Sequence, residues 1–317
     1  MKKLFIALLV LLAIVVGLYA YFVYAPKPAE PTLSASLQHE RIQVGELQRD
    51  YSYYVPKNLP ANAPLVFVLH GSLQTSEDIR AFSGYEYERL ADANGFVVVY
   101  PQGFEKNWND CRAAADYPAR AQNINDSGFI KALIERFSAQ QHTDSHRVFL
   151  TGYSSGAHLG FRLALEQPTL LAGIAAVAAN LPAPGNLACQ QSGKAVSMLI
   201  INGTADPVNP YKGGEVSLLG LGSRGSVRSA QDTALYFADL AGYTKPSLNA
   251  PTSVANVHLQ QWQAAGQHEV ALYSLLGGGH VVPQPVYQSP RMLGATLPGF
   301  NAPEIIWAFF ARQPAQP

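Results

Sequence analysis

The segment from His146 to Gly160 restricts the fold of this chain most strongly, because it reads HRVFLTGYSSGAHLG. Its apolar run, Val148 to Leu150, favours a short buried strand, and apolar pairs spaced four apart after the turn favour a helix. The turn between them has the form G-x-S-x-G, which strains the backbone of Ser154 and leaves no room for side chains two residues away. Because glycine occupies both of those positions, we predict a tight strand–turn–helix unit that exposes the Ser154 hydroxyl.

Apolar runs elsewhere predict strands that alternate with helices. Continuous apolar runs, typical of strands buried on both faces, cover residues 64–69, 96–100, 172–179 and 197–202. Helices are predicted at 76–94 with Ser76 as N-cap, at 126–139, at 229–242 and from 302 to about 312, where Asn301 and Glu304 suggest a capping box. A hairpin over 36–55 and a pair of late strands at 257–263 and 269–275 complete the pattern. The alternation predicts an α/β fold with a mainly parallel central sheet and helices on both faces, whose ligand-binding loops meet at the carboxyl ends of the strands.

The N-terminal segment is apolar without interruption from Leu4 to Ala25 and follows two lysines. At 1.5 Å per residue it is about 33 Å long, enough to cross a bilayer core of about 30 Å. Because Pro26 disfavours cleavage after Ala25, we interpret residues 1–25 as an uncleaved membrane anchor with the rest of the chain outside the cytoplasm. The alternative is a cleaved signal peptide, which would make the protein secreted. Residues 26–36 then form a proline-rich linker, and residues 37–317 one large domain.

Composition and cysteine usage narrow the function classes. Lysine plus arginine and aspartate plus glutamate number 22 each, so no net charge favours nucleic acid. The chain has no H-E-x-x-H, no Cys/His cluster and no GxxxxGK loop, and we therefore expect neither a metal nor another cofactor. Cys111 and Cys189 are the only cysteines, and outside the cytoplasm such a pair favours a disulfide worth ~4 kcal/mol; two free thiols are the alternative.

Three side chains near predicted strand ends are candidates for nucleophilic catalysis. A serine attacks well only when a base removes its proton and a carboxylate fixes the tautomer of that base. With Ser154 as nucleophile, Asp206 follows the strand at 197–202 as candidate acid, and His280 follows three glycines as candidate base. This chain order is typical of α/β-hydrolases. His158 precedes every candidate acid, so we assign it to helix packing.

The negative charge that develops on a substrate carbonyl oxygen needs fixed hydrogen-bond donors. We predict an oxyanion hole from the main-chain N–H groups of Ser72 and Ser155, with His70 organising the loop that carries Ser72. Aromatic residues that are candidates for substrate binding, or for ordinary packing, are Trp108, Tyr153, Trp262 and Tyr287.

Five motifs occur together in this chain: VLHGS, WNDCR, GYSSGA, NGTADPVNPY and GGGH. Their order and spacing over roughly residues 45–312 resemble the polyhydroxybutyrate depolymerase and feruloyl esterase-like group of α/β-hydrolases. The resemblance implies an α/β-hydrolase fold and serine-dependent hydrolysis of carboxylic esters, with Ser154, Asp206 and His280 as the catalytic triad. The chain departs from extracellular polymer depolymerases by having no appended binding module. We therefore expect soluble or cell-envelope esters, such as hydroxyalkanoate oligomers or feruloyl-type esters, rather than an insoluble polyester.

Two other hypotheses about the function of this chain remain open. A serine peptidase or acyltransferase would use the same triad on the same fold, since nothing in the triad distinguishes an ester from an amide. A non-catalytic binding protein of the cell envelope would keep the fold, but it would not need serine, acid, base and oxyanion loop together.

Overall fold

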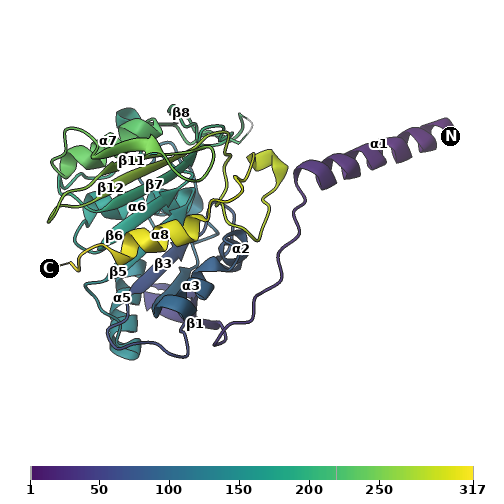
Figure 1. Ribbon diagram of the computed structural model, residues 1–317. Coiled ribbons are helices and arrows are strands. Elements are labelled where there is room, and N and C mark those ends of the chain that lie inside the picture. Colours follow the sequence, from purple (N-terminus) through teal and green to yellow (C-terminus); the bar gives the residue numbers. More distant parts are fainter. Residues whose placement is uncertain (1, 219, 317) are drawn as a thin grey trace.

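The computed structural model describes residues 2–218 and 220–316, which form a large sheet covered by helices and preceded by a projecting helix (Figure 1). The helices are α1 (Lys2–Phe22), α2 (Ser76–Phe82), α3 (Glu86–Asn94), α4 (Pro118–Ala121), α5 (Asp126–Gln141), α6 (Ser155–Glu166), α7 (Ala230–Leu240) and α8 (Ala302–Ala311), with the 3-10 turns η1 (Pro184–Asn186) and η2 (Arg291–Leu293). The strands are β1 (Gln38–Val44), β2 (Leu47–Tyr54), β3 (Leu65–Leu69), β4 (Val97–Pro101), β5 (Val148–Tyr153), β6 (Gly173–Val177), β7 (Met198–Gly203), β8 (Gly214–Glu215), β9 (Ser226–Val227), β10 (Leu248–Pro251), β11 (Val257–Trp262) and β12 (Val270–Leu275).

Ten of these strands form one sheet in the order β1-β2-β4-β3-β5-β6-β7-β12-β11-β10. The central strands from β4 to β12 are parallel to one another. The hairpin β1–β2 and the pair β11–β10 add antiparallel strands at the two edges. The predicted mainly parallel sheet is therefore confirmed, whereas the short edge strand β10 has no apolar pattern that would have predicted it.

Helices cover both faces of the sheet: α5, α6 and α7 pack on one face, and α2, α3 and α8 on the other (Figure 1). The strands β3 to β6 are buried along their whole lengths, which explains why their sequences are mostly apolar. The loops that follow β3, β5, β7 and β12 all leave from the same edge of the sheet, because these strands are parallel. The candidate site residues lie on these loops.

The single helix predicted over residues 76–94 is wrong, because the structure divides it into α2 and α3. The break lies at Gly84 and Tyr85, whose φ angles of +67° and +57° are outside the helical range. Gly84 also contacts another part of the chain closely, since a Cβ there would lie 2.5 Å from Oε1 of Gln284. The positive φ of Gly84 and the close approach of Gln284 therefore both favour glycine at the break.

One predicted helix N-cap is wrong by one residue, and the other is the predicted residue but lacks the capping hydrogen bond. The N-cap of α2 is Thr75 rather than Ser76: the Thr75 hydroxyl accepts from the N–H of Asp78, and the Asp78 carboxylate accepts from the N–H of Thr75. Asn301 precedes α8 as predicted but makes no capping bond with its side chain. Its amide instead donates to Glu86 at 2.9 Å, so a tertiary contact replaces the predicted capping box.

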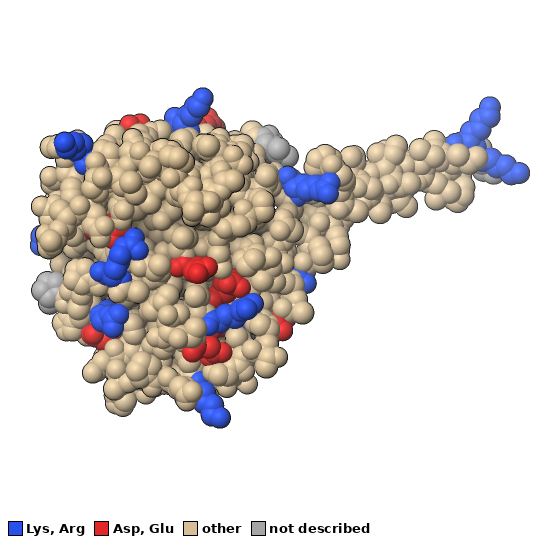
Figure 2. All heavy atoms as spheres, in the orientation of Figure 1, with Lys and Arg blue, Asp and Glu red and all other residues tan. Residues whose placement is uncertain are grey.

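The N-terminal helix α1 extends away from the sheet, and none of its residues is buried (Figure 1). Figure 2 shows lysine side chains at its free end, and the rest of the helix carries no charged side chain of its own. Among the described residues it is the one helix that is long and apolar enough to cross a membrane. The segment 26–36 runs along the surface of the domain, where Lys27 contacts Asp78 at 2.8 Å and Ser34 hydrogen-bonds Asp92. At the end of α1, the guanidinium of Arg291 lies 4.2 Å from the ring centre of Tyr21.

Candidate active site

Ser154 lies on the turn between β5 and α6, as the sequence predicts, with φ of 53° and ψ of −114°. Two close backbone contacts make this turn possible. A Cβ on Gly152 would lie 2.3 Å from the main-chain carbon of Gly156, and a Cβ on Gly156 would lie 2.6 Å from the carbonyl oxygen of Leu69. Since real Cβ atoms do not approach so closely, glycine at both positions is a steric requirement of the strained serine turn.

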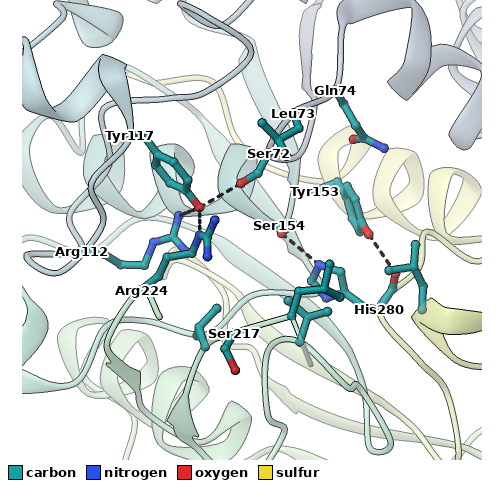
Figure 3. A pocket seen from close by; sticks show the side chains of 14 residues that line it. Ser72, Leu73, Gln74, Arg112, Tyr117, Tyr153, Ser154, Ser217, Arg224 and His280 are labelled. Carbon is teal, nitrogen blue, oxygen red and sulfur yellow. Dashed lines mark hydrogen bonds between the residues drawn. The ribbon is translucent and has the colours of Figure 1, made fainter. Parts of the chain in front are cut away.

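His280 lies between Ser154 and Asp206. Figure 3 shows its contact with Ser154. Its Nε2 atom is 3.0 Å from Ser154 Oγ, and its Nδ1 atom is 2.8 Å from Asp206 Oδ2. The other carboxylate oxygen of Asp206 accepts from the N–H groups of Val208 and Asn209, both at 2.8 Å. Asp206 and His280 are both buried, so water competes little for these contacts. The arrangement keeps Nδ1–H of His280 directed at the carboxylate and leaves Nε2 free to accept the serine proton.

The loop that carries His280 is held by main-chain contacts that require the preceding glycines. The N–H of His280 donates to the carbonyl of Leu293 at 2.6 Å, and the N–H of Ala205 donates to the carbonyl of Gly278 at 2.9 Å. A Cβ on Gly279 would lie only 2.2 Å from the Leu293 carbonyl oxygen. The hydroxyl of Tyr153 adds a bond to the carbonyl of His280 at 2.8 Å. The backbone of this loop is therefore fixed on several sides, which positions the imidazole.

The predicted oxyanion donors lie on the loops after β3 and β5. No acceptor among the described residues takes a hydrogen bond from the N–H of Ser72 or of Ser155, so both donors remain available. Below Ser72, Nδ1–H of His70 donates to the carbonyl of Gly71 at 2.7 Å, while Nε2 accepts from the N–H of Gly103 at 2.9 Å. Burial lowers the pKa of His70 to about 4, so His70 is a neutral residue that organises this loop.

A cavity of about 210 Å³ opens beside Ser154 and His280. Tyr153 lines it, as the sequence suggests, but Trp108 does not. Trp108 is completely buried, its Nε1–H donates to the carbonyl of His70 at 2.9 Å, and its ring packs on the His70 imidazole. The prediction of Trp108 as a substrate contact is therefore wrong, because its only polar atom already supports the loop after β3.

Sequence reasoning also missed two arginines and a tyrosine that line the cavity, namely Arg112, Tyr117 and Arg224. Arg112 lies inside the WNDCR motif, and this position next to Cys111 was the available signal. Arg224 lies in a polar, glycine-rich stretch that carries no periodic pattern, so its position in the site follows only from the structure.

A disulfide joins Cys111 to Cys189 and holds the WNDCR segment against the loop after β6, as predicted. Next to it, Arg112 and Asp110 form a completely buried ion pair. Burial alone would raise the pKa of Asp110, but the charge and hydrogen bonds of Arg112 outweigh it and lower that pKa below its usual value. Asp110 therefore stays ionised and neutralises Arg112 beside the cavity.

His158 lies on α6, buried against Phe161, and its Nδ1 atom has no hydrogen-bond partner among the described residues. Burial, followed by the charge of Arg112, holds the pKa of His158 well below its usual value. The imidazole is therefore neutral, and no hydrogen bond among the described residues joins it to the Ser154 hydroxyl, which instead lies 3.0 Å from Nε2 of His280.

A mainly parallel sheet with a serine on the sharp turn after its central strand β5 is the α/β-hydrolase fold. Residues 49–192 match the family described as Esterase PHB depolymerase, and the predicted family resemblance is confirmed in this part of the chain. The solved acetyl xylan esterase from Aspergillus awamori has a TM-score of 0.59 and 21% identity, over 78% of this chain and 95% of that chain. At this identity the likeness supports the fold alone.

Two curated relatives are also named as esterases or depolymerases. The "Putative esterase NocK" of Nocardia uniformis subsp. tsuyamanensis is 29% identical over 193 residues, covering 60% of this chain and 54% of that protein. Poly(3-hydroxyalkanoate) depolymerase C of Paucimonas lemoignei is 33% identical over 126 residues, covering 39% of this chain and 30% of that protein. The chain thus spans about half the length of the first relative and less than a third of the second.

Proposed function

We propose that this protein is a serine-dependent carboxylic ester hydrolase that works through an acyl-enzyme. The observation that carries the proposal is the position of His280, within hydrogen-bond distance of both Ser154 Oγ and Asp206 Oδ2. The family match and the esterases among the sequence relatives support the same class of reaction.

In the first half of the reaction, Ser154 Oγ attacks the ester carbonyl carbon while Nε2 of His280 takes the serine proton. The carbonyl oxygen gains a negative charge, and the N–H groups of Ser72 and Ser155 are the donors that would stabilise it. When the tetrahedral intermediate collapses, the C–O bond to the leaving alcohol breaks and His280 protonates that alcohol. Asp206 stabilises the positively charged imidazole in between.

In the second half, a water molecule replaces the alcohol. His280 takes a proton from this water, the resulting hydroxide attacks the acyl carbon, and the carboxylic acid leaves as the proton returns to Ser154 Oγ. The same donors stabilise the second oxyanion. No metal or other cofactor enters these steps, because the protein groups supply nucleophile, base and oxyanion donors.

The size of the cavity favours short acyl groups. Its volume of about 210 Å³ equals roughly seven water molecules at about 30 Å³ each. An acetyl or hydroxybutyryl group fits this space with room to spare, whereas the larger feruloyl group would fill it. We therefore favour short-chain esters, such as acetyl esters and hydroxyalkanoate oligomers, over feruloyl esters.

Two measurements test the proposal. A fluorophosphonate probe should label the wild-type protein at Ser154 and should not label Ser154→Ala. The wild type should hydrolyse 4-nitrophenyl acetate and butyrate faster than methyl ferulate. Absence of both labelling and ester turnover in a folded protein would contradict a hydrolase.

We further propose that α1 anchors the domain, residues 37–317, to a membrane through the linker 26–36, with the domain outside the cytoplasm. The length and exposure of α1, together with the disulfide, support this location. The full-length protein should then fractionate with membranes and resist a high-salt wash, while deletion of residues 1–28 should release a soluble, active domain. A mature N-terminus at or after Pro26 would instead identify α1 as a cleaved signal sequence.

A further inference from the structure

The cavity beside Ser154 carries an unbalanced positive charge. Arg112 and Arg224 both line it, and among the described residues of its wall there is no carboxylate. The charge of Arg112 is neutralised by Asp110, through a buried ion pair. Arg224 has no carboxylate within ion-pair distance in the described part of the chain. One guanidinium charge at the substrate cavity is therefore left without a partner.

The contacts of Arg224 leave its terminal nitrogens free. Its Nε–H donates to the hydroxyl of Tyr117, and its guanidinium lies 5.0 Å from the centre of that ring. The main-chain carbonyl of Arg224 accepts from the side-chain amide of Asn186 at 2.9 Å, which holds the backbone of this segment. Neither Nη atom has a hydrogen-bond partner among the described residues. An arginine held in this way presents a pair of donors with the spacing of a carboxylate.

Tyr117 connects this cation to the predicted oxyanion loop. Its hydroxyl oxygen accepts from Arg224 and lies 3.5 Å from Nη2 of Arg112, so its single proton is directed to Ser72 Oγ at 3.0 Å. Figure 3 shows Tyr117 between Ser72 and the two arginines, on the side of the cavity away from His280. The cationic group and the predicted oxyanion loop therefore belong to one hydrogen-bond network, which lines the same cavity as Ser154.

We propose that Arg224 binds a free carboxylate on the substrate, so that the preferred substrates are short esters that also carry an acid group. The proposal rests on the ester hydrolysis proposed above and names its substrate class. A four- or five-carbon acid ester suits the volume of the cavity, and its carboxylate would balance the unpaired charge. The attraction between this carboxylate and Arg224 should be stronger than at an exposed arginine, because Arg224 is partly buried and water screens the interaction less.

Two matched pairs of esters test this preference in a pH-stat. Methyl hydrogen glutarate against methyl pentanoate places the carboxylate on the acyl side, and 4-acetoxybutanoate against butyl acetate places it on the alcohol side. We expect the wild type to show a higher kcat/KM for the acid ester in at least one pair. In Arg224→Gln that ratio should fall about 10- to 100-fold, and Arg224→Lys should recover part of it.

Arg228→Gln is the matched control. Arg228 lies four residues further on and also stacks on an aromatic ring, 4.9 Å from the centre of Tyr236, but it does not line the cavity. Its substitution should leave the ratio unchanged, and thermal unfolding should show that all variants fold. The inference is overturned if neither pair shows a preference in the wild type. It is also overturned if Arg224→Gln lowers kcat/KM equally for acid and neutral esters, since that result indicates a role in holding the loop. If Ser154→Ala kept the wild-type turnover of every ester, the proposed function itself would fail instead.

Discussion

Replacing Asp206 with asparagine preserves the shape of the side chain but exchanges one carboxylate oxygen for an NH2 group. In the wild type, Oδ1 accepts from the N–H groups of Val208 and Asn209, while Oδ2 contacts Nδ1 of His280. An amide can reproduce only one of these two functions at a time. The cost of the substitution therefore depends on which orientation the amide adopts.

With the amide oxygen toward the two main-chain donors, the NH2 group of residue 206 faces Nδ1 of His280. His280 must then carry its proton on Nε2, where it cannot take the proton of Ser154. The opposite orientation restores the productive tautomer but sets NH2 against two N–H donors, losing two hydrogen bonds at about 1–3 kcal/mol each. Since 1.4 kcal/mol is a factor of ten, the productive population falls roughly 30-fold to 10⁴-fold.

The assay is kcat for 4-nitrophenyl acetate at pH 7.5 in Asp206→Asn and in Asp239→Asn. Asp239 is exposed on α7, so the second variant makes the same chemical change away from the site and should retain wild-type turnover. We expect a decrease within the range above for Asp206→Asn, without a matching loss of thermal stability. If that variant kept more than a third of the wild-type kcat, Asp206 would not control the tautomer of His280.

Three further predictions concern the triad, the disulfide and the buried His70. Ser154→Ala and His280→Ala should each lower kcat at least about 10³-fold, and the double variant should be no worse than either. His158→Ala should keep kcat within about tenfold of the wild type, and normal turnover in His280→Ala would contradict the assignment. Cys111→Ser combined with Cys189→Ser opens a loop with a sequence separation of 78, so urea unfolding should show up to about 4.5 kcal/mol lower stability, and no change would contradict the crosslink. Burial lowers the pKa of His70 to about 4, so between about pH 6.5 and pH 4 the unfolded chain binds a proton there that the folded protein does not bind. Over this range the contribution of His70 should lower the free energy of unfolding by about 3 kcal/mol as the pH falls. Urea unfolding at several pH values should show that the free energy of unfolding depends less steeply on pH in His70→Gln than in the wild type. An unchanged pH dependence would refute this account.

Local sterics explain why so much of this site could be predicted. The requirement for glycine at 152 arises from main-chain contacts within the serine turn, whereas Gly156 is required by the carbonyl groups of Leu69 and His70 on the neighbouring strand. The pentapeptide carries both signals because this packing recurs wherever the serine turn follows a strand of such a sheet. Asp206 and His280 each lie on a turn directly after a strand, and few other acidic residues or histidines of this chain occupy such a position. Their proximity could be expected because parallel strands end at one edge of the sheet.

The sequence alone failed where a side chain had two compatible roles. Trp108 is equally suited to a binding pocket and to packing, and the choice depends on the His70 carbonyl that its Nε1–H reaches. The capping box expected at Asn301 is compatible with the local sequence too. Its amide instead reaches Glu86, which is 215 residues away in the chain.

The sequence by itself therefore determined the α/β-hydrolase sheet, the strained serine turn and the identity of the candidate triad, because each is signalled by local periodicity or by a short motif at the end of a strand. Only the tertiary structure decided the charge of the cavity. Arg112 is neutralised beside it and Arg224 is not, although both have the same side chain. The contact between Tyr117 and Arg224 joins residues 107 positions apart, and such a contact depends on how two loops pack rather than on the sequence of either loop.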